Sequence, residues 1–262
     1  MKALITGATA GIGAACAKAL AKAGHEVIVH GRSEAKCALV VKEIQDQGGT
    51  ARAELADFSS LAQVRALADR LANQELDVLL NNAGVWMNTR QETEDGFELT
   101  WQTNHLAPFL LTQRLLPGLL KRPAARVITI SSSGHTAGRI HFNDINLSAG
   151  FNGMAAYCQS KLANVLFTQE LARRTQGSSL ITVAVDPGAV QTDLLAQTGF
   201  NPPSAKPAEE GVGKWLPAVM AVQDSAANGG YFAPTGRLST PATNDAKLAA
   251  RLWALSEAQT AL

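Results

Sequence analysis

The sequence contains few of the residues that mark several large classes of protein. Its three cysteines, Cys16, Cys37 and Cys158, are odd in number and lack metal-ligand spacing, so we expect neither a disulfide framework nor a metal site. Charged residues make up 17% of the chain and the formal net charge is only +1. Nothing in this composition indicates nucleic acid or an anionic membrane as a partner. A small molecule is therefore the expected ligand.

Long hydrophobic runs are also absent. The first apolar stretch, residues 1–5, ends at Thr6-Gly7 before the core of a signal peptide is complete, and no run approaches the length of a transmembrane helix. We therefore expect a soluble, cytoplasmic protein. The 262 residues, 46% of them hydrophobic, suit one large domain over residues 1–262 with an ample core.

Short apolar segments alternate with helical patterns along the chain. Connections of a dozen or more residues between strands imply parallel pairing, with helices covering the sheet. The sequence therefore predicts an α/β fold, a doubly wound parallel sheet of about seven strands with helices on both faces. The expected strands are residues 2–6, 26–30, 52–55, 77–80, 126–131, 180–185 and 229–232, and a closing helix is expected over 246–256.

Two segments fit this alternation less simply. Residues 92–120 predict one or two helices with a break near Pro108 or Pro117, because proline interrupts a helix. Residues 194–217, rich in proline, are the least regular part of the chain. Long loops in compact domains are often functional, so we expect a substrate lid there, with a surface excursion as the alternative.

A glycine-rich turn lies between the first strand and the helix that follows it. In this context, missing side chains let the backbone approach a pyrophosphate, and the start of the helix holds it with free N–H groups and a positive dipole. A tight turn that needs positive φ is the alternative. The expected dinucleotide-binding residues of this turn are Gly7, Thr9, Gly11, Ile12 and Gly13.

The end of the second strand indicates which dinucleotide binds. Where dinucleotide folds carry an acidic residue for the adenosine ribose, this chain has His30-Gly31-Arg32-Ser33. Arg32 can pair bidentately with a ribose 2′-phosphate, so we expect NADP(H) rather than NAD(H), with Ser33 beside it. A solvated arginine leading a helix is the alternative. Asp57, after the third strand, is expected to accept from the adenine amino group or to cap the next helix.

Tyr157 and Lys161 are the candidates for proton transfer. They are four residues apart in a predicted helix, so their side chains share one face. An ammonium about 4 Å from a phenolate attracts it by roughly 4 kcal/mol gross at an effective dielectric near 20. Such a pair is expected to lower the tyrosine pKa and to let the phenol exchange a proton with a substrate oxygen. An exposed helical pair is the alternative.

These motifs, together with Asn81-Asn82-Ala83-Gly84, Asn104 and Ser132, resemble the short-chain dehydrogenase/reductase family. Residues 138–142 and 156–174 are most similar to its retinol dehydrogenase-like members. The resemblance implies a single-domain Rossmann fold. It also implies NADPH-dependent hydride transfer between the nicotinamide and the carbonyl or alcohol of an apolar small molecule, with reduction of an aldehyde or ketone favoured.

The resemblance also implies roles for the matching residues. Tyr157 is expected to be the acid–base, and Lys161 to lower its pKa and bond the nicotinamide ribose. Ser132 is expected to orient the substrate oxygen, although the residues alone leave its neighbours Ser131 and Ser133 equally open. Asn104 is expected to hold a relay water. The family's remaining cofactor positions correspond to Asn82, Ala83, Gly84, Pro187, Gly188, Val190 and Thr192.

Further predictions concern the substrate and the assembly. Reductases of a conjugated carbon–carbon bond share the Tyr-Lys pair, and a non-catalytic NADPH-binding sensor or scaffold is a second alternative, although such proteins usually lose a catalytic residue. Retinoid-handling members often carry a membrane anchor before the first strand, whereas the expected first strand here begins at residue 2. A soluble enzyme for another apolar aldehyde or ketone is therefore equally expected. Family analogy suggests a homodimer or homotetramer. Candidates for an apolar pocket, or for the core, are Trp86, Met87, Phe151, Met154 and Trp215.

Overall fold

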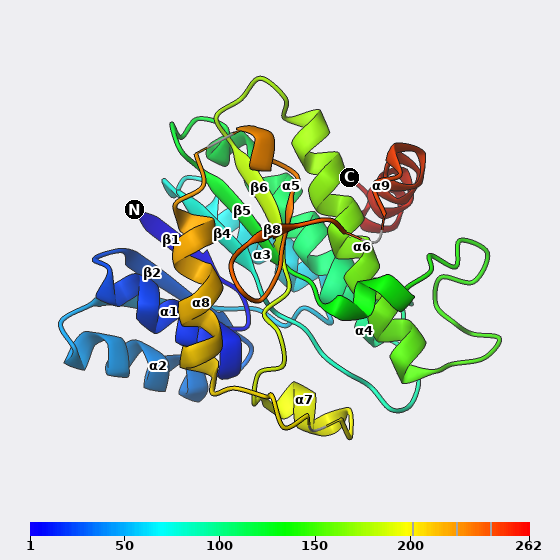
Figure 1. Cartoon of the computed structure of the whole chain (residues 1–262), viewed down its shortest axis with the longest axis horizontal. Coiled ribbons are helices and arrows are strands. Elements are labelled where there is room, and N and C mark those ends of the chain that lie inside the picture. The colour runs from blue at the N-terminus through cyan, green and yellow to red at the C-terminus, as the bar shows by residue number, and fades with distance from the viewer. Residues whose placement is uncertain (201, 224, 242) are drawn as a thin grey trace.

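The centre of the molecule is one mixed sheet (Figure 1). The computed structural model describes residues 1–200, 202–223, 225–241 and 243–262. Within them the strand order is β3-β2-β1-β4-β5-β6-β7-β8. The strands are β1 Lys2–Ile5, β2 Glu26–Gly31, β3 Thr50–Leu55, β4 Val78–Asn81, β5 Arg126–Ile130, β6 Ile181–Val185, β7 Tyr231–Phe232 and β8 Leu238–Ser239.

The pairing confirms the predicted doubly wound sheet. Strands β1 to β7 pair in parallel, and β1 lies between β2 and β4, so the chain order reverses direction there. Ligands bind beyond the carboxyl ends of the strands at such a reversal. The eighth strand, β8, was not predicted, because its two residues are too few to show a periodic pattern. It runs antiparallel to β7.

Helices cover both faces of the sheet, as predicted. On one face lie α1 Gly11–Lys22, α2 Glu34–Asp46 and α8 Ala208–Met220. On the other lie α3 Leu61–Leu71, α5 Ala107–Leu119 and α6 Gly153–Arg174, with α9 Ala246–Thr260 packed beside α6. Successive strand side chains point to opposite faces, so Leu4 packs in the cluster under α3 and α5, and Ile5 in the cluster under α1 and α8.

The prediction of a helix break near Pro108 or Pro117 is wrong. The short helix α4 Leu99–Trp101, a π-helical turn η1 Gln102–Leu106 and α5 follow one another without interruption. Pro108 stands directly after the wider π-helical turn, and Pro117 lies in the last turn of α5. Proline is tolerated in the first turn of a helix, which is where Pro108 stands in α5, and Pro117 is followed by only two further residues of that helix.

The segment over 194–217 is more regular than predicted. It begins within α7 Asp193–Gln197 and ends within α8. On α8, Val212, Trp215 and Val219 recur at helical spacing and are buried in the core, so Trp215 does not belong to a substrate pocket. Asn201, part of the expected lid, lies outside the described residues.

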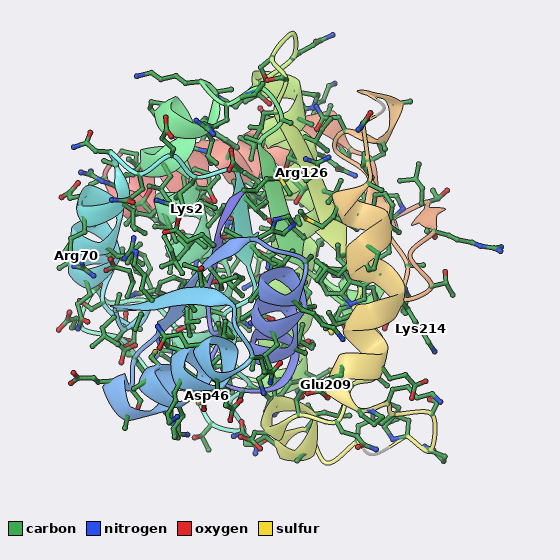
Figure 2. The ribbon with its side chains drawn as sticks, turned by 90° about the vertical axis from the view of Figure 1, so that its left-hand side faces the viewer. Lys2, Asp46, Arg70, Arg126, Glu209 and Lys214 are labelled. Atoms are coloured by element: carbon green, nitrogen blue, oxygen red, sulfur yellow. The ribbon has the colours of Figure 1, made fainter. Side chains whose placement is uncertain are left out.

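Several charged side chains lie on the outer surfaces of the helices. Figure 2 shows Asp46 at the end of α2, and Glu209 and Lys214 on α8. Within the part of the chain that the structure describes, no helix combines the length and the hydrophobicity needed to cross a membrane.

Candidate active site

A cavity of about 1040 Å³ lies across the carboxyl ends of β1 to β6. It brings the glycine turn, the end of β2 and the α6 pair Tyr157 and Lys161 to one place, although they are far apart in sequence. Among the predicted site residues, Ser33 and Asn104 do not line it. Those that line it are Gly7, Thr9, Gly11, Ile12, Gly13, Arg32, Asp57, Asn82, Ala83, Gly84, Ser132, Tyr157, Lys161, Pro187, Gly188, Val190 and Thr192.

The glycine turn is held close to the segment after β4. A Cβ on Gly13 would lie 2.3 Å from the Gly7 carbonyl oxygen, so no larger residue fits there. Gly7 itself has φ +63°, in the left-handed region that favours glycine. The amide nitrogen of the Asn82 side chain donates to the carbonyls of Thr6 and Gly7 at 2.8 and 3.1 Å. The residue before α1, Ala10, offers no side-chain cap, so N–H groups of the first turn remain available to an anion.

His30 is a supporting residue that the sequence analysis missed. Its Nδ1 accepts from the Gly7 N–H at 3.4 Å, its Nε2 lies 3.2 Å from the Ala56 carbonyl, and its ring stacks on Phe58. Burial lowers the pKa of His30 to about 4, so the ring is neutral near pH 7 and donates through Nε2. His30 therefore ties the glycine turn to the segment after β3. The only sequence signal was a histidine at the end of a strand.

The residues expected to bind adenosine lie around the ends of β2 and β3. Arg32 is exposed and lines the cavity. Ser33 instead caps α2 by accepting from the Lys36 N–H at 3.4 Å. The Asp57 carboxylate accepts from the backbone N–H and the hydroxyl of Ser59 at 2.9 and 2.8 Å, so it orders the approach to α3. The roles of these residues toward a nucleotide stay predictions.

Tyr157 and Lys161 meet at the base of the cavity. Asn152 caps α6 by accepting from the Ala155 N–H at 2.9 Å, which fixes the start of the helix that carries both side chains. The Lys161 ammonium lies 5.3 Å from the centre of the Tyr157 ring and donates to the Ile130 carbonyl at 3.2 Å. Lys161 is only 3% exposed, so the alternative of an exposed helical pair is wrong.

The pKa values of this pair are set mainly by burial. Burial raises the pKa of Tyr157 to about 12, against the lowering effect of its hydrogen bond with Ser132, and the charge of Asp186 raises it further. The net direction is opposite to the predicted lowering, which counted the lysine charge and omitted desolvation. Burial lowers the pKa of Lys161 to about 8, opposed by Asp186. At neutral pH the phenol is therefore protonated and the lysine mostly charged.

Asp186 is a second neighbour that the sequence analysis did not assign. It follows β6, is 7% exposed and lines the cavity near Tyr157 and Lys161. Its carboxylate accepts from the Gly188 N–H at 2.9 Å and hydrogen-bonds with Tyr231 of β7. A buried carboxylate stabilises a nearby ammonium, so Asp186 helps to keep Lys161 charged.

Asn104 lies on the π-helical turn η1, behind the cavity. Its Oδ1 accepts from the Val85 N–H at 2.7 Å, and its Nδ2 donates to the Val85 carbonyl at 3.0 Å and to the Ser160 hydroxyl at 3.1 Å. The side chain thus holds the segment after β4 against α6. Its role in a water relay stays a prediction.

The segment after β6 closes one side of the cavity. Gly188 has φ +78°, and a Cβ there would lie 3.0 Å from Pro234. Thr192 caps α7 by accepting from the Leu195 N–H at 3.2 Å. A Cβ on Gly11 would lie 2.8 Å from the Thr192 methyl group, so this segment packs directly on the glycine turn.

Apolar side chains line the cavity beside Tyr157. The Trp86 ring centre is 5.3 Å from that of Tyr157. Met87 and Met154 also contribute, as predicted, whereas Phe151 does not line the cavity. The sequence analysis did not single out three further lining residues, Leu194, Leu195 and Phe200. Among the described residues, no histidine, cysteine or carboxylate cluster could hold a metal ion.

Comparison with known proteins identifies the family. The sequence model described as short chain dehydrogenase matches residues 1–201. The chain belongs to the short-chain dehydrogenase family. This dehydrogenase is 44% identical to human retinol dehydrogenase 11 over 201 residues, which are 75% of this chain and 63% of that protein. It is 38% identical to human retinol dehydrogenase 13, with 97% of this chain and 82% of that protein covered.

Solved structures confirm the fold. An uncharacterised protein of Mycobacterium paratuberculosis superposes with a TM-score of 0.81 at 35% identity, covering 99% of this dehydrogenase and 93% of the other chain. A short chain dehydrogenase from Burkholderia cenocepacia, solved in complex with NADP, gives a TM-score of 0.72 at 28% identity, covering 89% and 96%. The dehydrogenase therefore has the Rossmann fold that the resemblance implied.

Proposed function

We propose that this dehydrogenase uses NADPH to reduce the aldehyde or ketone group of an apolar small molecule. The observation that carries the proposal is the placement of Tyr157, hydrogen-bonded with Ser132 and 5.3 Å by its ring centre from the Lys161 ammonium, in the same cavity as the glycine turn. Family membership supports oxidoreductase chemistry on a carbonyl or alcohol.

The side chains of the cavity provide acid catalysis. A carbonyl oxygen placed between Ser132 and Tyr157 accepts a hydrogen bond from Ser132 and the proton of Tyr157. The Lys161 ammonium lies 5.3 Å from the centre of the Tyr157 ring and stabilises the phenolate that remains. The nicotinamide dinucleotide, when bound, supplies the hydride to the carbonyl carbon. The glycine turn, with the free N–H groups of α1, is suited to hold its pyrophosphate.

The preference for NADPH is supported by the end of β2. Arg32 directly follows β2, is exposed and lines the cavity, and the end of β2 carries no carboxylate, so Arg32 can pair with a 2′-phosphate there. The Burkholderia relative was solved with NADP. We assign Arg32 to the 2′-phosphate and Asp57 to the adenine.

The apolar character of the substrate is supported by the cavity wall. Trp86 lies beside Tyr157, and Met154 and Phe200 are 53% and 62% exposed although they line the cavity. Large apolar side chains left open to water beside a cavity favour an apolar ligand. Residues 194–200 form part of this wall, and we assign them to a lid that closes over the substrate. Two of the relatives are named retinol dehydrogenases, and retinol is an apolar alcohol, which supports an apolar substrate.

Consumption of NADPH with a panel of apolar aldehydes, ketones and enones tests this function. We expect loss of NADPH absorbance with aldehydes or ketones, slower loss with NADH, and none with the Tyr157→Phe protein. Selective turnover of enones to saturated ketones would instead establish the carbon–carbon reductase. Tight NADPH binding without turnover on the whole panel would favour the sensor alternative.

A further inference from the structure

A hairpin over residues 92–98 forms one wall of the cavity. It is closed by an antiparallel bridge between its end residues, Glu92 and Glu98. Its first arm, residues 92–94, lines the cavity together with residues around the start of α3. Because α3 begins shortly after Asp57, the hairpin stands at the end of the cavity to which we assign the adenine.

Asp95, at the turn of the hairpin, connects it to two other elements. Its Oδ2 accepts from the backbone N–H of Leu61 and from the side-chain Nε2 of Gln102, both at 2.8 Å. Leu61 is the first residue of α3, where free N–H groups and the helix dipole stabilise a carboxylate. Gln102 is the first residue of the π-helical turn η1 and is fully buried. One carboxylate therefore joins the hairpin, α3 and η1.

Gln102 also holds the arm of the hairpin that lines the cavity. Its Oε1 accepts from the Thr93 hydroxyl at 2.6 Å, and its Nε2 donates to the Phe58 carbonyl at 3.4 Å as well as to Asp95. Thr93 Oγ1 accepts in turn from the Phe97 N–H at 3.2 Å. Because a carboxylate only accepts, the amide nitrogen of Gln102 faces Asp95 and its oxygen is left for Thr93. The hydrogen bonds thus fix the orientation of this buried amide.

The start of α3 holds Asp57 in place as well. Gln63 Oε1 accepts from the Asp57 N–H at 2.9 Å, and the hydroxyl of Ser60, which caps α3, accepts from the Gln63 N–H at 3.4 Å. Asp57, Ser60 and Gln63 line the cavity, as do Thr93 and Glu94 of the hairpin. The first turn of α3 therefore connects the residue assigned to the adenine with the hairpin wall.

We propose that Asp95 and Gln102 are positioning residues that hold the 92–98 hairpin as a preformed wall of the adenine subsite. Neither side chain lines the cavity, so both act through Thr93 and Glu94, which do. The inference rests on the proposed function, since it assumes that the adenine binds at this end of the cavity.

Release of the hairpin is expected to weaken every ligand that carries adenosine by the same factor. A wall that is fixed in the free protein costs no ordering free energy when the nucleotide binds, whereas a released arm must be ordered at that moment. NADPH, NADH and adenosine 2′,5′-bisphosphate should therefore all bind roughly fivefold more weakly. The catalytic residues lie at the other end of the cavity, so kcat at saturating NADPH should stay unchanged.

Asp95→Ala tests this expectation by isothermal titration with the three ligands. It removes the acceptor that α3 and η1 share, so we expect all three Kd values to rise by the same roughly fivefold factor. Asp95→Asn retains an oxygen that can accept both hydrogen bonds and is expected to regain most of the affinity. Unchanged Kd values in Asp95→Ala overturn the proposal. A fall in kcat as large as the rise in Kd also overturns it, because the effect would then lie at the catalytic end.

Two variants control this comparison. Asp69→Ala removes another carboxylate of α3, one that pairs with Arg114 of α5 at 2.6 Å and does not line the cavity, so all three Kd values should stay unchanged. Arg32→Ala is expected to weaken NADPH and the bisphosphate but not NADH, so the pattern across the ligands separates a lost phosphate contact from a lost wall. Should Asp95→Ala fail to fold, Gln102→Met decides. It keeps a long unbranched side chain without the hydrogen bonds, and an unchanged Kd for the bisphosphate in that variant overturns the proposal.

Binding of the bisphosphate provides a readout that does not depend on turnover. A wild-type chain that binds NADPH but reduces no carbonyl refutes the proposed reduction alone, and the Kd values of Asp95→Ala then decide the role of the hairpin. A wild-type chain that binds none of the three ligands refutes the adenine subsite and with it this inference.

Discussion

The two ends of the cavity differ in how far they exclude water. Arg32, at the end that we propose holds the adenosine, is exposed, whereas Lys161, at the end that we propose is catalytic, is 3% exposed. Exposed charges are screened and contribute mainly to the choice of ligand, while buried groups acquire large pKa shifts. One cavity therefore combines a hydrated end suited to select the dinucleotide with a dry end suited to hold an acid in its protonated form.

The largest effect is expected at the dry end. Tyr157→Phe removes the proton donor while preserving the ring beside Trp86, so kcat should fall by about 10² to 10⁴, the usual contribution of a general acid. The Kd for NADPH should change little. Steady-state kinetics and fluorescence titration measure the two quantities. Turnover that survives the substitution would contradict the assignment of Tyr157 as the acid.

The pH dependence of turnover is the next largest expected effect. Burial lowers the pKa of Lys161 to about 8, so the ammonium is present below this pH and is lost as the pH rises through it. Tyr157, with a pKa of about 12, stays protonated in this range. We expect kcat/KM to fall by about tenfold per pH unit above that pKa, as for the loss of one essential proton.

Asp186 offers a matched control for this profile. Asp186→Asn removes the charge that raises the Lys161 pKa, so the falling limb should move to lower pH. An identical pH profile in wild type and Asp186→Asn would show that this carboxylate does not act on Lys161.

At the hydrated end, Arg32→Ala tests the choice of dinucleotide. Loss of a charge-assisted pair with the 2′-phosphate should raise the KM for NADPH by about tenfold and leave that for NADH nearly unchanged. Lys36, the nearest basic residue in sequence, provides the control variant Lys36→Ala, for which a smaller effect is expected. Equal effects of Arg32→Ala on both dinucleotides would show that Arg32 does not read the phosphate.

The smallest effect is expected at the apolar wall. Trp86→Leu retains a hydrophobic side chain but removes the flat ring next to Tyr157, so the KM for an apolar aldehyde should rise by roughly fivefold through lost apolar contact area. The kcat should change less. The KM values of wild type and variant, measured with a matched series of short and long aliphatic aldehydes, test this expectation. A KM that is the same for wild type and variant across the series would remove Trp86 from the substrate site.

The sequence was sufficient to predict the parallel sheet and the meeting of the glycine turn with Tyr157 and Lys161. These depend on local periodicity and on the rule that ligands gather at the carboxyl ends of strands. His30 and Asp186 were missed because their importance comes from partners distant in sequence, Gly7 for the first and Tyr231 for the second. The direction of the Tyr157 pKa was predicted wrongly for a related reason. The spacing of two residues in a helix shows that their charges interact, but it does not show how much water the fold removes around them.

A titration of the Tyr157 phenol tests the dry catalytic end most directly. The chain has two tyrosines, so the Tyr231→Phe protein carries Tyr157 alone and its tyrosinate absorbance reports that one group. We expect no tyrosinate signal through neutral and mildly alkaline pH, because burial raises the pKa of Tyr157 to about 12. Ionisation of Tyr157 near neutrality would contradict the account, since the group would then be a phenolate and could not donate the proton that the reduction requires.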